Sequence, residues 1–169
     1  VTMAVSAVPH TMIAQEAPAE PQPERVSFGL PTARDRERWR ESAIHELRAA
    51  IGRSSDPNKR ALLRVKLARE LAWPRNATNL ELAIEAASQA LREASGHDAK
   101  AEANWALGHL HEDHEHYAIA ISFYQEILDR YPNTPIETIC DKKNNRYPTL
   151  HRMAGCYAAL GDRRNAVDA

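Results

Sequence analysis

The densest group of chemically reactive side chains lies between His109 and His116, where four histidines and three carboxylates follow one another closely. Imidazole nitrogens and carboxylate oxygens are ligands that zinc, nickel and copper accept. Side chains three or four positions apart share one face of a helix, so some of these groups could approach one ion. The candidate metal ligands are His109, His111, Asp113, His114 and His116.

The same run also has a simpler interpretation as a polar turn between two helices. Along a helix, His109 and His111 point to different faces, which works against a single site. His111 would then pack in place of an aromatic residue. Because several histidines titrate near neutrality, such a turn could respond to pH. We favour the turn and keep a metal- or pH-responsive site as the alternative.

Cys156 and His151 are the pair in this sequence that most resembles a nucleophile with its base. Their separation on one predicted helix directs them to different faces, and no third group follows to orient the base. The chain has 6 glycines and lacks a Gly-rich phosphate-binding loop. The sequence therefore predicts neither an enzyme nor a bound cofactor.

Composition narrows the classes of partner. The chain of 169 residues is 43% apolar and 27% charged, with a net charge of −1. This near-neutral charge argues against a protein built for nucleic acid. The local cluster of arginines in Ala33–Arg40 is interrupted by Asp35 and Glu37. No apolar run approaches the roughly 20 residues that span a bilayer. We expect membrane contact only indirectly, through a partner or a lost signal segment.

The segment before the helical region has a different composition. Residues 1–31 are rich in proline and alanine, which predicts an extended tail. Val1–Ala7 is similar to the end of an apolar secretion segment, which favours a periplasmic or otherwise exported protein over a cytoplasmic one. We expect the tail to tether the protein to a partner. The candidate contacts are Val5, Val8, Met12 and Ile13.

From residue 32 to residue 169, capping residues and apolar spacing predict an all-α domain of about seven antiparallel helices. Thr32 caps the first helix and Gly52 ends it, and Asp56-Pro57 begins the second. Asn79 is expected to cap the third helix. The remaining helices are expected over about Asp98–Leu110, Glu115–Tyr131 and Pro148–Leu160, with a last one after Gly161-Asp162.

One stretch of this domain carries a family pattern. Leu107-Gly108, Ala120, Tyr124 and Pro132 stand in the order and spacing of a tetratricopeptide repeat, over a length of about 34 residues. We expect Gly108 to pack against Ala120 where the two helices cross. The best match covers residues 101–134, an incomplete one covers 147–169 and a degenerate one covers 58–96. Between the first two, Pro135–Arg146 is an insertion that we expect to protrude.

The repeat itself resembles those of exported bacterial assembly proteins, on the sequence from Phe123 to Pro135. The resemblance implies a solenoid of helix pairs that works as a protein-binding scaffold, as an accessory subunit of a larger assembly. It also implies a groove lined by the first helix of each pair. The groove residues so nominated are Glu102, Trp105, Ala106, His109, His151 and Ala158.

Two consequences follow for ligand binding at this groove. The family's receptors for chaperone tails clamp a terminal carboxylate with lysine and asparagine, and Trp105 and His109 stand at the matching places. We therefore expect no clamp of that kind. Trp105 either anchors an apolar or extended peptide or is buried within the helical stack.

Overall fold

The structure is a computed structural model that describes residues 31–137 and 145–169. These residues form seven helices and no strands, so the predicted all-α class is confirmed for the described part of the chain. Pro31–Ala169 makes one compact unit. The predicted tail contacts Val5, Val8, Met12 and Ile13 lie outside the described residues. The helices are α1 (Ala33–Arg53), α2 (Pro57–Leu71), α3 (Ala77–Glu93), α4 (His97–Asp113), α5 (Tyr117–Arg130), α6 (Arg146–Ala159) and α7 (Arg163–Asp168).

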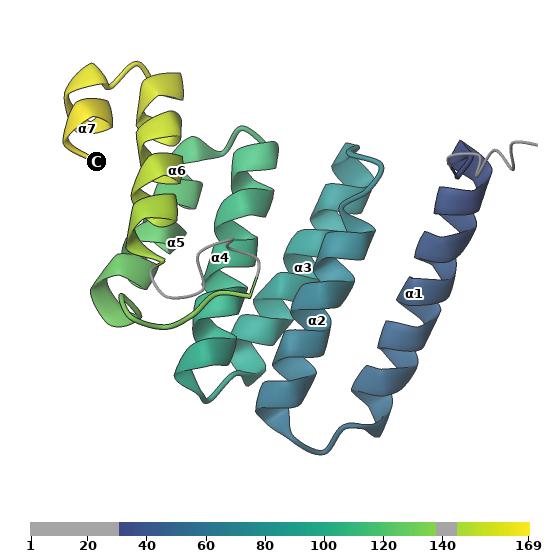
Figure 1. Cartoon of the computed structure of the whole chain (residues 1–169). Helices are drawn as coiled ribbons and strands as arrows, with labels where there is room; N and C mark the ends of the chain where they lie inside the picture. The colour runs from purple at the N-terminus through teal and green to yellow at the C-terminus, as the bar shows by residue number, and fades with distance from the viewer. Residues whose placement is uncertain (1–30, 138–144) are drawn as a thin grey trace, which may run out of the picture. The chain divides into compact units, whose positions relative to one another are not determined.

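Neighbouring helices pack side by side, and each runs back along the one before it (Figure 1). α2 also contacts α4, so these two helices share one face of the unit. α1 contains no buried residue and packs against α2. The face shared by α2 and α4 is thus the place where side chains distant in sequence can meet.

Local hydrogen bonds set where the helices begin. At α1, Asp35 N–H donates to the Thr32 hydroxyl over 3.2 Å, and Thr32 N–H donates to the Asp35 carboxylate over 3.0 Å. The prediction that Asn79 caps the third helix is wrong. Asn76 caps α3 by accepting from Asn79 N–H at 2.9 Å, while the Asn79 side chain donates back to the Pro74 carbonyl at 3.0 Å. The helix therefore begins at Ala77.

α4 is the most buried helix of the described chain, since every residue of Ala101–Gly108 is buried. Gly108 allows another helix to approach closely. A methyl group at Gly108 would clash with Cε1 of Tyr124, because it would lie well inside contact distance. The sequence predicted Ala120 as the neighbour of Gly108, but the three nearest atoms all belong to the Tyr124 ring. Ala120 is fully buried nearby in the same cluster as Tyr124.

The insertion Pro135–Arg146 does not protrude as a whole. Ile136 is fully buried in the cluster that joins α4, α5 and α6, because its apolar side chain fills space between them. Asn145 is also buried, and its side-chain amide donates to the carbonyls of Tyr131 at 2.7 Å and Thr134 at 2.8 Å. Both ends of the insertion thus belong to the core, and residues 138–144 lie outside the described residues.

Replacing Gly108 by alanine should destabilise the fold. The added methyl group meets the buried ring of Tyr124, whose hydroxyl is held by Glu112, so the ring has little room to move. We expect a loss of about 1–3 kcal/mol in the free energy of unfolding. Urea denaturation followed by circular dichroism would measure it.

Gly155→Ala supplies the matched control. Gly155 lies in α6, and nothing stands within 4 Å of the methyl group that alanine would add. This variant should gain about 0.5–1 kcal/mol from helix propensity. If the two alanine variants had the same free energy of unfolding, the methyl group added at Gly108 would not clash with the Tyr124 ring.

Candidate partner-binding pocket

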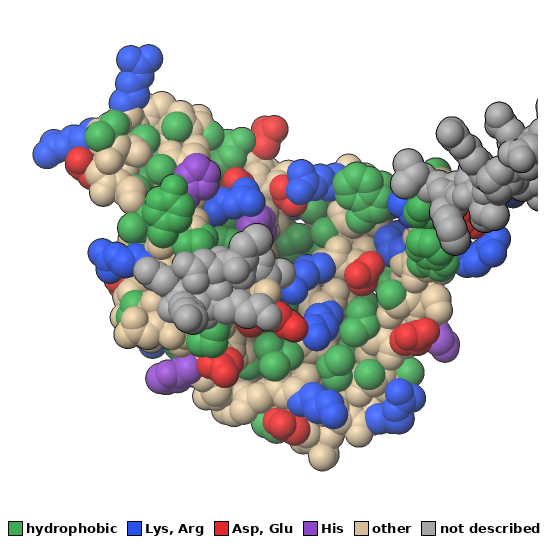
Figure 2. Space-filling model, viewed as in Figure 1, with side chains coloured by type: hydrophobic (Ala, Val, Ile, Leu, Met, Phe, Trp, Pro, Cys, Tyr) green, Lys and Arg blue, Asp and Glu red, His purple; other side chains and the backbone are tan. Residues whose placement is uncertain are grey.

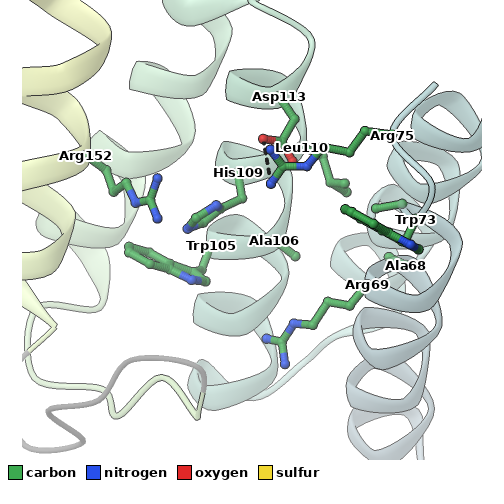
Figure 3. Close-up of a pocket in the computed structure, with 11 residues that line it drawn as sticks. Ala68, Arg69, Trp73, Arg75, Trp105, Ala106, His109, Leu110, Asp113 and Arg152 are labelled. Atoms are coloured by element: carbon green, nitrogen blue, oxygen red, sulfur yellow. Dashed lines mark ion pairs between the residues drawn. The ribbon is translucent and has the colours of Figure 1, made fainter. Parts of the chain in front are cut away.

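A pocket of about 400 Å³ opens on the face that α2 shares with α4, with one side chain from α6 at its edge (Figure 3). Its volume lies in the range of sites that receive a small ligand or the side chains of a peptide. α4 supplies the floor, while α2 and the loop after it supply one wall. The lining residues are Ala68, Arg69, Ala72, Trp73, Arg75, Trp105, Ala106, His109, Leu110, Asp113 and Arg152.

Two tryptophans lie on opposite sides of this pocket (Figure 3). Trp105 is only 7% exposed, with ring centroids 5.0 Å from His109 and 5.5 Å from Tyr124. Of the two alternatives for Trp105, the structure therefore supports burial in the helical stack, with an edge reaching the pocket. Trp73 is 62% exposed and is the accessible aromatic side chain here. Trp73 was not among the groove residues that the sequence nominated.

Three arginines of the pocket each pair with a carboxylate of α4. In every pair the arginine side chain is the more exposed partner and the carboxylate side chain the more buried one. The pairs are Arg69 with Glu102 at 2.8 Å, Arg75 with Asp113 at 3.2 Å, and Arg152 with Glu112 at 3.2 Å. Burial raises the pKa of Asp113, and the neighbouring Arg75 opposes that rise.

Glu102 was nominated for the groove surface, but its carboxylate is a buried structural acceptor. Its side chain is 5% exposed and accepts hydrogen bonds from Arg69 and from the backbone N–H of Glu137. Glu137 also pairs with Lys66 of α2 at 3.6 Å. Glu102 thus links α2, α4 and the segment after α5, below the pocket rather than within it.

His109 lies on the pocket floor and is uncharged at neutral pH. Burial lowers its pKa to about 4, and the charge of Arg152 lowers it further than Glu112 raises it. The Arg69 and Arg75 charges act in the same direction as Arg152. The ring therefore contributes an aromatic surface rather than a charge, and it is placed in a positive field.

Two other nominated groove residues, His151 and Ala158, do not line the pocket. Both are exposed on α6, and His151 stacks on Tyr147 with ring centroids 6.3 Å apart. The next residue, Arg152, is the one that faces α4. A shift of one position on a helix turns a side chain by roughly 100°, which explains the difference.

The predicted metal site is not assembled. Among residues 31–137 and 145–169, no three histidine, cysteine or acidic side chains converge so as to hold an ion. The physical reason is that the cluster divides between two faces. His109 packs on Trp105 and Asp113 pairs with Arg75, whereas His111 stacks on Phe123 and His114 on His116. The interpretation of His111 as an aromatic substitute agrees with its stacking on Phe123.

Cys156 and His151 do not meet as a nucleophile and base. Cys156 is buried, and burial raises the pKa of its thiol to about 11, so the sulfur stays protonated. His151 lies on the exposed side of the same helix. The negative charge of Glu112 contributes to the raised pKa of Cys156. The Glu112 carboxylate also accepts a hydrogen bond from the Tyr124 hydroxyl at 2.8 Å.

Comparisons of this chain with family models, curated proteins and solved structures found no match. The described helices are also too short or too polar for any of them to cross a membrane. The pocket itself is therefore the feature from which function is inferred.

His109→Phe should reduce the loss of stability on acidification. The pKa of His109 is lower in the folded protein than in the unfolded chain, so the unfolded chain binds the extra proton between about pH 6.5 and about pH 4. Stability should fall as pH decreases through that window and lose nothing more from this group below it.

Phenylalanine keeps the ring contacts and removes the proton-binding site. Thermal or urea unfolding at about pH 8 and about pH 4.5 would give the difference between wild type and variant. Since other acid-sensitive groups are common to both proteins, the difference isolates His109. Parallel pH curves would contradict the buried, neutral histidine.

Proposed function

We propose that this protein is an interaction scaffold that binds an extended segment of a partner protein in the pocket between α2, α4 and α6. The observation that carries the proposal is the exposed Trp73 facing the buried Trp105, with arginines around them. Tryptophan and arginine are enriched among residues that dominate binding energy at protein interfaces. A concave site with an apolar floor and a few polar groups suits a peptide side chain.

In this function the helices would take a tetratricopeptide arrangement. Residues 58–96, 101–134 and 147–169 would form helix pairs in which α2, α4 and α6 come first. The direct contact of α2 with α4 and the insertion of the Tyr124 ring at Gly108 support this register. In it, the first helices line the inner face, which is where the pocket lies.

Binding rather than catalysis is the role that the pocket chemistry favours. Its arginines are engaged with carboxylates, its histidine is neutral, and Cys156 is a buried thiol. The proposal therefore assigns no catalytic residue. The scaffold would serve as an accessory subunit of a larger assembly, as a periplasmic or otherwise exported protein. Residues 1–30 would form a second contact with the partner.

Trp73→Ala tests the site. Peptides selected from a random linear library against the full chain should lose about tenfold or more in affinity when Trp73 is removed, because the exposed ring is the main contact surface. Fluorescence anisotropy with the selected peptides would measure this. The indole is 62% exposed, so the fold should survive its loss.

Trp39→Ala is the matched control, since Trp39 is 61% exposed on α1 and does not line the pocket. It should leave the affinities unchanged. Selected peptides that lose affinity equally in both variants, or in neither, would place binding elsewhere on the chain and contradict the proposal.

Removal of residues 1–30 tests the tether. Because Pro31–Ala169 is a compact unit, the circular dichroism of that unit should be unchanged by the truncation. Co-purification of partners with the truncated chain should weaken, since two linked contacts hold better than one. Full retention of the partners would exclude the tether, and lost helicity would make the segment part of the domain.

A further inference from the structure

The accessible surface of the pocket is positive although its charges balance. The Arg75 side chain is 63% exposed and that of its partner Asp113 is 19% exposed, and for Arg152 and Glu112 the figures are 42% and 24%. Figure 2 shows basic and acidic side chains around a hollow on this face that is lined by apolar ones. A ligand that enters the pocket therefore meets cations before it meets their counter-charges.

These arginines have hydrogen-bonding capacity left for a ligand. A guanidinium carries five N–H donors in a rigid planar group, and one ion-pair contact to an internal carboxylate does not use them all. Asp113 and Glu112 also hold Arg75 and Arg152 in position before any ligand arrives. Side chains ordered in advance lose less conformational entropy on binding.

The floor beneath them is apolar and aromatic. Ala106 and Leu110 of α4 lie between the rings of Trp105 and Trp73, and His109 adds a neutral ring. An apolar side chain could be desolvated there without leaving a buried charge unpaired. The pocket thus combines one apolar position with cations on both sides of it.

We propose that the bound segment is an acidic peptide with an apolar side chain between Trp73 and Trp105 and carboxylates at Arg75 and Arg152. This proposal rests on the proposed function and specifies its ligand. Arg75 follows α2 and Arg152 lies on α6, so the two cations stand on different sides of the floor. The ligand would place acidic residues on both sides of its apolar one.

Single-stranded nucleic acid is the competing ligand, because bases stack on tryptophan and phosphates pair with arginine. The pocket favours the peptide. Nucleic-acid grooves follow the backbone with an extended positive surface, whereas each arginine here stands above its own carboxylate and the chain has a net charge of −1. A short peptide with a few carboxylates needs no extended positive surface, because contacts with Arg75 and Arg152 are enough for it.

The test compares three labelled pools of short peptides on the full chain. Each pool has a central leucine or phenylalanine, flanked by aspartate and glutamate, by asparagine and glutamine, or by lysine and arginine. A single-stranded oligonucleotide is the fourth probe. We expect the acidic pool to bind about fivefold or more tighter than the neutral pool at low salt, with a smaller margin at high salt.

Arg75→Gln combined with Arg152→Gln should remove that preference, so that the acidic pool binds no tighter than the neutral pool. Arg92→Gln is the control, since Arg92 lies on α3, is 62% exposed and pairs with Glu85 as Arg75 pairs with Asp113. It should preserve the preference. Circular dichroism of each variant would confirm that the helices are intact.

The two proposals fail in different ways. Equal affinity for the acidic and neutral pools, with binding still lost in Trp73→Ala, overturns the acidic ligand and leaves the peptide site standing. A preference for the acidic pool that persists in the double variant also overturns it, as does tighter binding of the oligonucleotide. Absence of any binding that depends on Trp73 overturns both proposals.

Discussion

The close contact between Gly108 and the ring of Tyr124 is the constraint on which the rest of the structure depends. Because Gly108 has no side chain, the ring can lie against α4, and its hydroxyl then reaches Glu112 at 2.8 Å. Glu112 in turn accepts from Arg152 at 3.2 Å and so connects α4 to α6. The same ring supports Trp105, which forms the floor of the pocket. The absence of a side chain at Gly108 thus helps to position α4, α5 and α6, as well as Trp105 on the pocket floor.

Carboxylates beneath arginines give the pocket its second physical feature. A buried carboxylate is costly unless it is paired and hydrogen-bonded. Glu102 meets both conditions, through Arg69 and the backbone of Glu137, and it also fixes the segment after α5 against α2. Asp113 and Glu112 are less buried and leave their arginines facing the solvent. The same kind of pair therefore holds the fold below the pocket and presents cations at its opening.

These features make the pocket a property of the assembled helices rather than of any one of them. Trp73 comes from the loop after α2, Trp105 from α4 and Arg152 from α6, and each is placed by packing that involves other residues. A peptide that binds them all would contact three helices at once. The interaction energy of such a ligand would also stabilise the arrangement of those helices, since it binds the folded form alone.

The sequence by itself determined the helices and the residues that permit their packing. Thr32 and Asp56 cap helices through hydrogen bonds to residues two or three positions away, so their roles could be predicted locally. Only the tertiary structure decided which side chains face the pocket. Arg69 lies 33 positions from Glu102 and Arg152 lies 40 from Glu112, and no local pattern encodes such pairs. For the same reason His151 was nominated where Arg152 lines the site, and Ile136 was assigned to a loop although it fills the core, since the direction of a side chain is set by neighbours that the fold supplies.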